Sequence, residues 1–157
     1  MCSPDEPSVR DHRVVFVFHC YRVWSEPGDP LHQCRPGDSI IVKGPDGTTV
    51  LLEAGNTGMG TSRVVPYLQS IGIQPANGLD YMIGGHQHCD HIGGLDEVIN
   101  AGYDVGIQSY YNGSSYQSSC VTSWNAAAAG TTAAARVVPT VGSQIPLGNG
   151  AHWFSSP

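Results

Sequence analysis

The sequence predicts a single α/β domain, and three observations support that prediction. Short apolar runs typical of strands alternate with segments that have the period of a helix. The chain has 157 residues, including 20 glycines and 11 prolines, a length that suits one domain with its own core and a composition that favours many turns. Between residues 79 and 108, a strand, a loop, a helix and a second strand follow one another in the order of a βαβ unit.

The first half of the chain predicts mainly strands. A β-branched and aromatic run, Val14–His19, is typical of a strand. Two further apolar runs, Ser39–Lys43 and Thr48–Glu53, flank Gly-Pro-Asp-Gly at 44–47, and this turn chemistry predicts a β-hairpin. A glycine-rich turn at 55–60 follows, and we expect it to lie near the histidine-rich segment described below.

Helices are predicted on both sides of a short apolar strand. Thr61 or Ser62 can cap a helix that runs to about Ile71. The strand is Leu79–Ile83, and a second helix, Leu95–Ala101, carries acidic residues in its first turn.

The last third of the chain is expected to contain a strand, a helix and a turn. Tyr103–Gln108 reads as a strand, and the alanine-rich segment Ser123–Arg136 as a helix. Short strand pieces around a turn are expected at Val137–Leu147, where two prolines and a glycine interrupt the chain.

Charge and cysteine usage exclude several classes of protein. The net charge is −6, which argues against a surface that holds nucleic acid non-specifically. The five cysteines are an odd number without a C-x-x-C pair, so we expect reduced thiols, with a Cys20–Cys34 bridge as the alternative. Cys89 is expected to pack in the core.

No membrane-spanning segment is predicted. The densest apolar run, Val14–Phe18, is far shorter than the roughly 18–20 residues that cross a bilayer, and it is also short for a signal peptide. The sequence therefore favours a soluble protein and a cytoplasmic location.

The segment GGHQHCDHIGG at 84–94 concentrates metal-ligand chemistry. In an extended segment His86, His88 and Asp90 point the same way, and a turn at Asp90 would bring His91 round. Imidazole and carboxylate suit zinc, and also manganese or iron. Four ligands in so short a segment favour two adjacent ions that hold a bridging hydroxide as nucleophile. The alternative is a polar loop of solvated histidines.

The motif His86-x-His88-x-Asp90-His91, with the strand LDYMI before it and GGL after it, resembles the signature of the metallo-β-lactamase superfamily. The texts GDSIIVKGPDGTTVLLEAG and NTGMG look most like the branch related to the hydrolase-like domain of the DNA-uptake competence protein. This resemblance implies a layered αββα sandwich. It implies that His86 and His88 bind a first metal and that Asp90 and His91 bind a second. It also implies a catalytic role for Asp90, which would handle the proton of the attacking water.

The chain departs from the family pattern before and beside the motif. Residues 33–36 read Gln-Cys-Arg-Pro where the branch usually has Asp-Val-Gly-Gln. Glu53 stands where the family usually has aspartate, so an extra methylene has to be accommodated. Gly85 stands where a threonine usually precedes the first histidine.

The resemblance covers the N-terminal half of the family domain. We expect an atypical N-terminal arm and strand at 1–36, the metallo-β-lactamase-like half at 37–150 and an atypical tail at 151–157. The family's second half brings a bridging aspartate and further histidines, and it should begin where this chain ends. His152 is the only downstream histidine, and we do not expect it to be a ligand.

The resemblance implies a metal-dependent hydrolase that acts on a phosphodiester or another ester, or on a related small molecule, rather than on a β-lactam. The alternative is a metal-binding but catalytically inactive, truncated fragment of such a hydrolase. Half of a two-sheet sandwich would also leave an apolar sheet face uncovered, so we expect self-association through that face.

Overall fold

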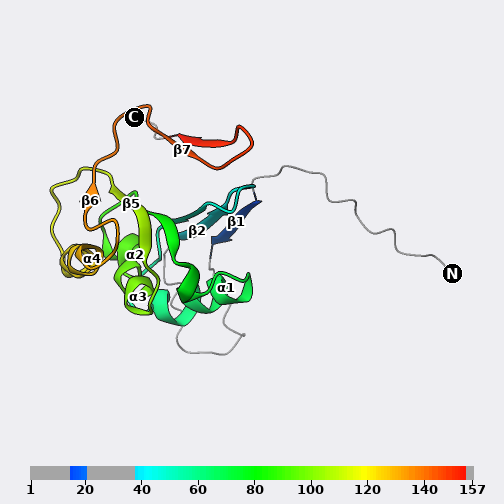
Figure 1. Cartoon of the computed structure of the whole chain (residues 1–157). Coiled ribbons are helices and arrows are strands. Elements are labelled where there is room, and N and C mark those ends of the chain that lie inside the picture. Colours follow the sequence, from blue (N-terminus) through cyan, green and yellow to red (C-terminus); the bar gives the residue numbers. More distant parts are fainter. Residues whose placement is uncertain (1–14, 21–37, 155–157) are drawn as a thin grey trace.

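The computed structural model describes residues 15–20 and 38–154 (Figure 1). Within these residues the chain forms a six-stranded sheet of order β1-β2-β3-β4-β5-β6 and a separate two-stranded sheet, β7-β8. The strands are β1 (Val15–Cys20), β2 (Asp38–Lys43), β3 (Thr49–Leu52), β4 (Leu79–Gly84), β5 (Val105–Tyr111), β6 (Arg136–Val137), β7 (Gln144–Pro146) and β8 (His152–Phe154). The helices are η1 (Gly60–Val64), α1 (Val65–Ser70), η2 (Pro75–Asn77), α2 (Cys89–Ile92), α3 (Leu95–Asn100) and α4 (Ser119–Ala129).

The N-terminal strands pair antiparallel, and the predicted hairpin is confirmed. Ile41 of β2 lies opposite Leu51 of β3. In the turn, Gly44 N–H donates to the Thr48 carbonyl at 2.7 Å. Gly47 has a φ of 96°, a left-handed conformation that glycine adopts without a steric penalty. The predicted first strand is also confirmed, displaced by one residue.

From β3 onward the strands pair in parallel, and the predicted βαβ unit is confirmed as β4–α2–α3–β5. β5 begins at Val105 rather than at the predicted Tyr103. The Tyr103 side chain is instead fully buried, and its hydroxyl donates to the Ile73 carbonyl at 2.8 Å. Tyr103 therefore anchors the connection between α3 and β5 in the core, and the hydrogen-bonded pairing of β5 starts after it.

The helices cover one face of the main sheet and enclose the larger core (Figure 1). Alternate strand residues such as Leu51 and Met82 point into this core, where α1, α3 and α4 contribute Leu68, Leu95 and Trp124. All five side chains are fully buried. Helices therefore cover this face of the sheet, as the predicted α/β class requires.

The opposite face of the sheet is covered in part by the β7–β8 hairpin (Figure 1). Ile145 and Leu147 pack against Val42, Val50 and Tyr81 in a second, smaller core. Apolar side chains around this core stay half-buried; they are Ile40, Leu52, Ile83 and Tyr110. The uncovered face expected from the sequence is therefore partly covered by the chain's own C-terminal segment.

The start of the first helix differs from the sequence prediction. Neither Thr61 nor Ser62 caps the first helix, which begins as a π-helical turn after Met59 without a side-chain cap. The Glu97 carboxylate of α3 accepts hydrogen bonds from the Gly58 and Thr61 amides instead. A carboxylate at a helix N-terminus accepts hydrogen bonds from the free amides there and interacts favourably with the helix dipole. Because the Glu97 carboxylate comes from a different helix, the residues next to the helix start could not reveal it.

The alanine-rich helix α4 begins earlier and ends earlier than predicted. Ser118 caps it by accepting a hydrogen bond from the Val121 amide at 3.2 Å. The helix ends at Ala129, and Gly130 follows as its C-cap. The predicted continuation to Arg136 is wrong because Arg136 pairs with Ser109 of β5 as part of β6.

Parts of the chain lie outside the described residues. These include most of the predicted N-terminal arm and the Cys20–Cys34 alternative, so both stay predictions. Among the described helices, none has the length and apolar character needed to cross a membrane.

Candidate metal centre

The histidine-rich segment lies at the carboxyl end of β4, as predicted, but its backbone is not extended throughout. His88 is still extended, with φ −80° and ψ 152°, and it is the N-cap of α2. Asp90 and His91 therefore lie in the first turn of a helix. The helix forms because Ile92 is fully buried in the core while the His91 carbonyl accepts a hydrogen bond from the Ala54 amide at 2.8 Å.

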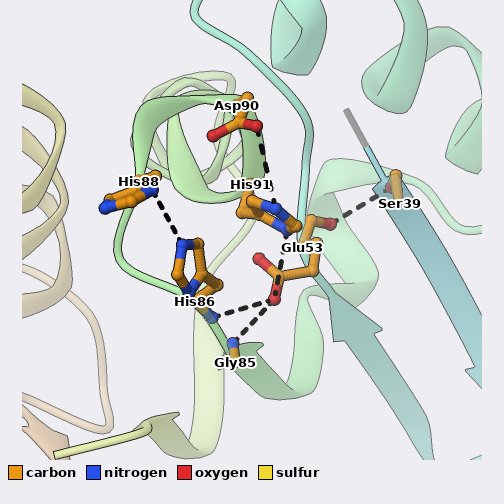
Figure 2. A network of polar contacts seen from close by, with 7 residues as sticks. All are labelled: Ser39, Glu53, Gly85, His86, His88, Asp90 and His91. Carbon is orange, nitrogen blue, oxygen red and sulfur yellow. Dashed lines mark hydrogen bonds and ion pairs between the residues drawn. The ribbon is translucent and has the colours of Figure 1, made fainter. Parts of the chain in front are cut away.

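Three imidazole rings adjoin one another in this segment (Figure 2). His86 Nε2 and His88 Nδ1 lie 2.8 Å apart and share a hydrogen bond. The ring centroids of His86 and His91 are 4.9 Å apart. Asp90 Oδ2 lies 3.8 Å from His91 Nε2, on the side of that ring away from His86 in Figure 2. The structure thus brings the four predicted ligands into one cluster.

The donor types of this cluster fit a divalent transition metal, because imidazole nitrogen and carboxylate oxygen are the usual ligands of zinc, manganese and iron. The side chains as placed do not converge: among the described residues, no three His, Cys, Asp or Glu groups are arranged to hold one ion. The hydrogen bond between His86 and His88 occupies one nitrogen of each ring. The metal ligand set therefore stays a prediction.

Glu53 directly follows β3 and supports the cluster from there, and it was given no role by the sequence. Its Oε1 accepts hydrogen bonds from the Gly85 amide at 2.8 Å and the His86 amide at 3.2 Å (Figure 2). The same oxygen lies 4.0 Å from His91 Nδ1. Glu53 has a φ of 57°, uncommon for a residue with a side chain, and the Ser39 hydroxyl donates to its carbonyl at 3.1 Å.

Burial changes the acidity of Glu53, whose side chain is 12% exposed. Desolvation raises its pKa from 4.5 to about 7; the two amide donors oppose this shift and the carboxylates of Asp38 and Asp90 add to it. The Oε2 atom is buried without a hydrogen-bond partner among the described residues. A carboxyl group that is about half protonated near neutral pH therefore lies directly beneath the histidines.

Glycines allow the Trp124 side chain and a neighbouring backbone segment to pack closely against the cluster. A Cβ on Gly84 would lie 2.5 Å from the Trp124 ring, and one on Gly93 would lie 2.5 Å from the Thr57 amide nitrogen. The predicted glycine turn at 55–60 does lie beside the cluster, because the Gly94 amide donates to the Gly55 carbonyl at 3.2 Å.

A loop at 112–118 forms a further wall of the cluster, and the sequence did not reveal it. Gln87 is only 2% exposed, and its amide donates to the Ser114 carbonyl at 3.0 Å. The Tyr116 ring of this loop contacts the His88 ring, with centroids 4.6 Å apart. Gln87 therefore points away from the histidines on either side of it and ties their segment to the next loop.

Cys89 does not remain a free thiol, which corrects the expectation of reduced cysteines for this pair. Cys89 forms a disulfide with Cys120 of α4, with Cα atoms 5.5 Å apart. The sequence argument assumed an extended segment, whereas α2 starts at Cys89 and turns its side chain toward α4. The two cysteines are 31 residues apart, so no short spacing pattern could reveal the bond.

No family model matches the chain, and no curated protein matches it either. Solved metallo-β-lactamases do resemble it in structure. MEM-A1, a subclass B3 metallo-β-lactamase isolated from a soil metagenome library, aligns with 73% of this chain and 44% of its own length, at 16% identity and a TM-score of 0.50. The MIM-2 metallo-β-lactamase aligns with 73% of this chain and 43% of its own length, at 22% identity and a TM-score of 0.47.

The similarity to MEM-A1 establishes the type of fold. The mixed sheet with helices on one face matches part of the metallo-β-lactamase fold, and the fold prediction is confirmed at that level. The chain spans less than half the length of the matched enzymes. Its relation to the DNA-uptake branch is a finer prediction and stays one.

Proposed function

We propose that this chain carries the metal-binding part of a metal-dependent hydrolase, with His86, His88, Asp90 and His91 as ligands. The observation that supports this most is their gathering at the carboxyl end of β4, with ring centroids 4.1 and 4.9 Å apart, in a metallo-β-lactamase-type fold. Zinc is the proposed ion, with manganese or iron as alternatives, and two ions would bind if further ligands complete the site.

A bound divalent ion would activate a water molecule and polarise the oxygen of the scissile bond. The chain's own residues would do the rest. His86 and His88 are exposed, so their rings can turn toward an ion once their mutual hydrogen bond breaks. Glu53 holds the backbone at Gly85 and His86 in place, and Asp90 would accept a proton from the attacking water.

Metal binding is the first test of this proposal. Protein purified without chelator should contain zinc, manganese or iron by elemental analysis, and a His86→Ala/His88→Ala variant should lose it. His152→Ala is the matched control, because it removes an exposed histidine of β8 that is not a proposed ligand. Equal metal content in the wild type and the His86→Ala/His88→Ala variant would contradict the proposal.

A phosphodiester or another ester is the proposed substrate, and the DNA-uptake branch is the proposed relation. Both rest on the sequence resemblance at 37–150, and the solved enzymes that resemble the fold make a β-lactam the rival substrate. Activated phosphodiester, carboxylic ester and chromogenic β-lactam substrates should be compared with added metal. We expect turnover of an ester that Asp90→Ala abolishes and that Asp46→Asn, in the exposed β2–β3 turn, leaves unchanged.

A second candidate function is metal binding without catalysis, as expected of a truncated fragment. It is favoured by the share of the matched fold that the chain spans, which is 44% of the length of MEM-A1. In this case metal binds and depends on His86 and His88, but no substrate is turned over. Turnover that requires Asp90 would exclude this second function.

Self-association is proposed through the face that the β7–β8 hairpin covers in part. The half-buried side chains of Ile40, Leu52, Ile83 and Tyr110 supply apolar surface there. Light scattering over a range of concentrations should show an oligomer. A monomer throughout, and an unchanged state in an Ile83→Ser variant, would contradict this.

The cytoplasmic location predicted from the sequence conflicts with the Cys89–Cys120 disulfide. Disulfides persist mainly in oxidising compartments and are rare in the cytosol. Trapping free thiols with an alkylating reagent in intact cells would decide between a cytoplasmic and an oxidising location. A cytoplasmic protein should be labelled at both Cys89 and Cys120.

A further inference from the structure

The Cys89–Cys120 disulfide lies inside the proposed ligand set. Cys89 stands between His88 and Asp90 and is the first residue of α2, and Cys120 lies in the first turn of α4. The bond therefore joins the ligand segment to a helix that belongs to the main core. Movement of Cys89 relative to α4 would move a proposed ligand on each side of it.

The segment 85–94 is held by hydrogen bonds on its β3 side. Glu53 accepts from the Gly85 and His86 amides, the Ala54 amide donates to His91, and the Gly94 amide donates to Gly55. These contacts hold both ends of the segment and the backbone beneath His91. They do not include His88 or Cys89, which lie toward α4.

On the α4 side the disulfide is the covalent link of the ligand-bearing turn to the core, beside a 3.9 Å contact between Cys89 Sγ and Ser118 Oγ. α2 has four residues, and a helix of that length does not form by itself in water, so its first turn depends on its attachments. Ile92 anchors the end of α2 in the core, and the disulfide anchors its beginning. Without the bond, the backbone of His88 and Asp90 would lose its covalent attachment to α4.

We propose that the Cys89–Cys120 disulfide is a redox-sensitive clamp: the oxidised bond holds His88 and Asp90 in position for a divalent metal ion, and its reduction loosens the ligand segment and weakens metal binding. The effect on metal binding rests on the metal site proposed above. The effect on the segment itself does not.

The chemistry of opening is thiol–disulfide exchange with a dithiol. A thiolate of the dithiol attacks Cys89 Sγ, which belongs to a half-buried residue, while Cys120 is 6% exposed. The Cys89–Cys120 bond breaks, a mixed disulfide forms, and Cys120 leaves as a thiolate that takes a proton. The second thiol of the dithiol then displaces Cys89, so that two electrons and two protons pass to the protein and the dithiol becomes a cyclic disulfide. A disulfide oxidant reverses the sequence.

Metal affinity tests the clamp. In a Cys2→Ser/Cys20→Ser/Cys34→Ser background, which leaves only the clamp pair, zinc affinity is measured by competition with a chelating dye. Adding Cys89→Ala/Cys120→Ala should weaken zinc binding roughly 10–100-fold, the range found when a supporting group of a metal ligand is removed. Dithiol treatment followed by removal of the reagent should also weaken binding, and reoxidation should restore it. Equal affinity of the oxidised protein and the Cys89→Ala/Cys120→Ala variant would overturn the proposal.

Hydrogen exchange separates the clamp from the metal proposal. With chelator present, reduction should speed amide exchange at 88–92 and leave β2 and β3 unchanged. This result would support the clamp even if the oxidised protein bound no zinc, in which case only the metal proposal would fail. Unchanged exchange at 88–92 after complete reduction, verified by mass spectrometry of alkylated thiols, would overturn the clamp whatever the zinc data show.

Discussion

The two sides of the histidine segment are held by different kinds of interaction. On the β3 side, the Glu53 carboxyl and backbone hydrogen bonds hold it, and the charge of Glu53 changes near neutral pH. On the α4 side, the Cys89–Cys120 disulfide holds it. One side should therefore respond to pH and the other to redox conditions, and variants of each side can separate the two.

The largest effect is expected from the α4 side. A disulfide across 31 residues restricts the unfolded chain, so Cys89→Ala/Cys120→Ala should lower the free energy of unfolding by about 3–4 kcal/mol. Denaturant titration without reductant measures this loss of unfolding free energy. Reduced wild-type protein is the control, because it lacks the bond but keeps both cysteine side chains. Unfolding midpoints that are equal with and without the bond would show that the α4 side does not depend on it.

On the β3 side, a pH-dependent effect is expected from Glu53. Its folded pKa of about 7 lies above the ordinary value of 4.5, so the folded state retains a proton that the unfolded state has lost between these values. The contribution of Glu53 to stability is therefore full below pH 4.5 and is lost as the pH rises to about 7. The loss is on the order of 3 kcal/mol, and Glu53→Gln should abolish it.

Chelator-treated protein unfolded in denaturant at several pH values measures the Glu53 effect. Asp46→Asn is the control with the opposite sign, because hydrogen bonds from Thr48 lower the pKa of Asp46. Its contribution is present above the ordinary pKa and is lost as the solution becomes acidic. Parallel stability curves for wild type and Glu53→Gln between pH 4.5 and 7 would contradict the raised pKa.

A smaller effect is expected where the segment packs against the glycine turn. Gly93 has a φ of −63°, so alanine meets no backbone strain there, but its Cβ would lie 2.5 Å from the Thr57 nitrogen. Gly93→Ala should cost about 1–3 kcal/mol of stability because two backbones must separate. Thermal unfolding compared with Gly130→Ala, where the nearest contact is an ordinary 3.4 Å, tests it. Equal losses in both variants would show that the close approach is unimportant.

The smallest effect is expected at the wall of the cluster. Gln87→Ala removes the hydrogen bond to the Ser114 carbonyl and should cost about 1–2 kcal/mol. Limited proteolysis at 112–117 should also become faster. Gln117→Ala is the matched control, because this exposed amide donates to the nearby Ser115 carbonyl within the same loop. Loop cleavage at the wild-type rate in Gln87→Ala would contradict the assigned role.

Local chemistry explains which parts of the fold the sequence could predict. The Gly-Pro-Asp-Gly turn, the apolar run before the histidines and the βαβ order depend on neighbouring residues, and all three are confirmed. The failures lie where a partner is distant along the chain. Glu97 replaces the predicted caps Thr61 and Ser62, and Arg136 joins β6 instead of extending the helix.

The candidate site divides in the same way. His86, His88, Asp90 and His91 were predicted from their spacing and from the family resemblance, and the structure gathers them at the end of β4. Glu53 appeared in the sequence only as a departure from a family pattern, since its contact with His86 spans 33 residues. The direction in which Cys89 points depends on where α2 begins, and a short spacing pattern does not reveal that start.

By itself, the sequence determined the α/β class, the hairpin and the residues that we propose as metal ligands, because each depends on local conformational preference or on side-chain type. Only the tertiary structure decided how those residues are held. Packing of α2 against the core placed Cys89 beside Cys120, and sheet pairing buried Glu53 beneath the histidines and raised its pKa. Burial and proximity arise from the folded chain as a whole, so no short stretch of sequence contains them.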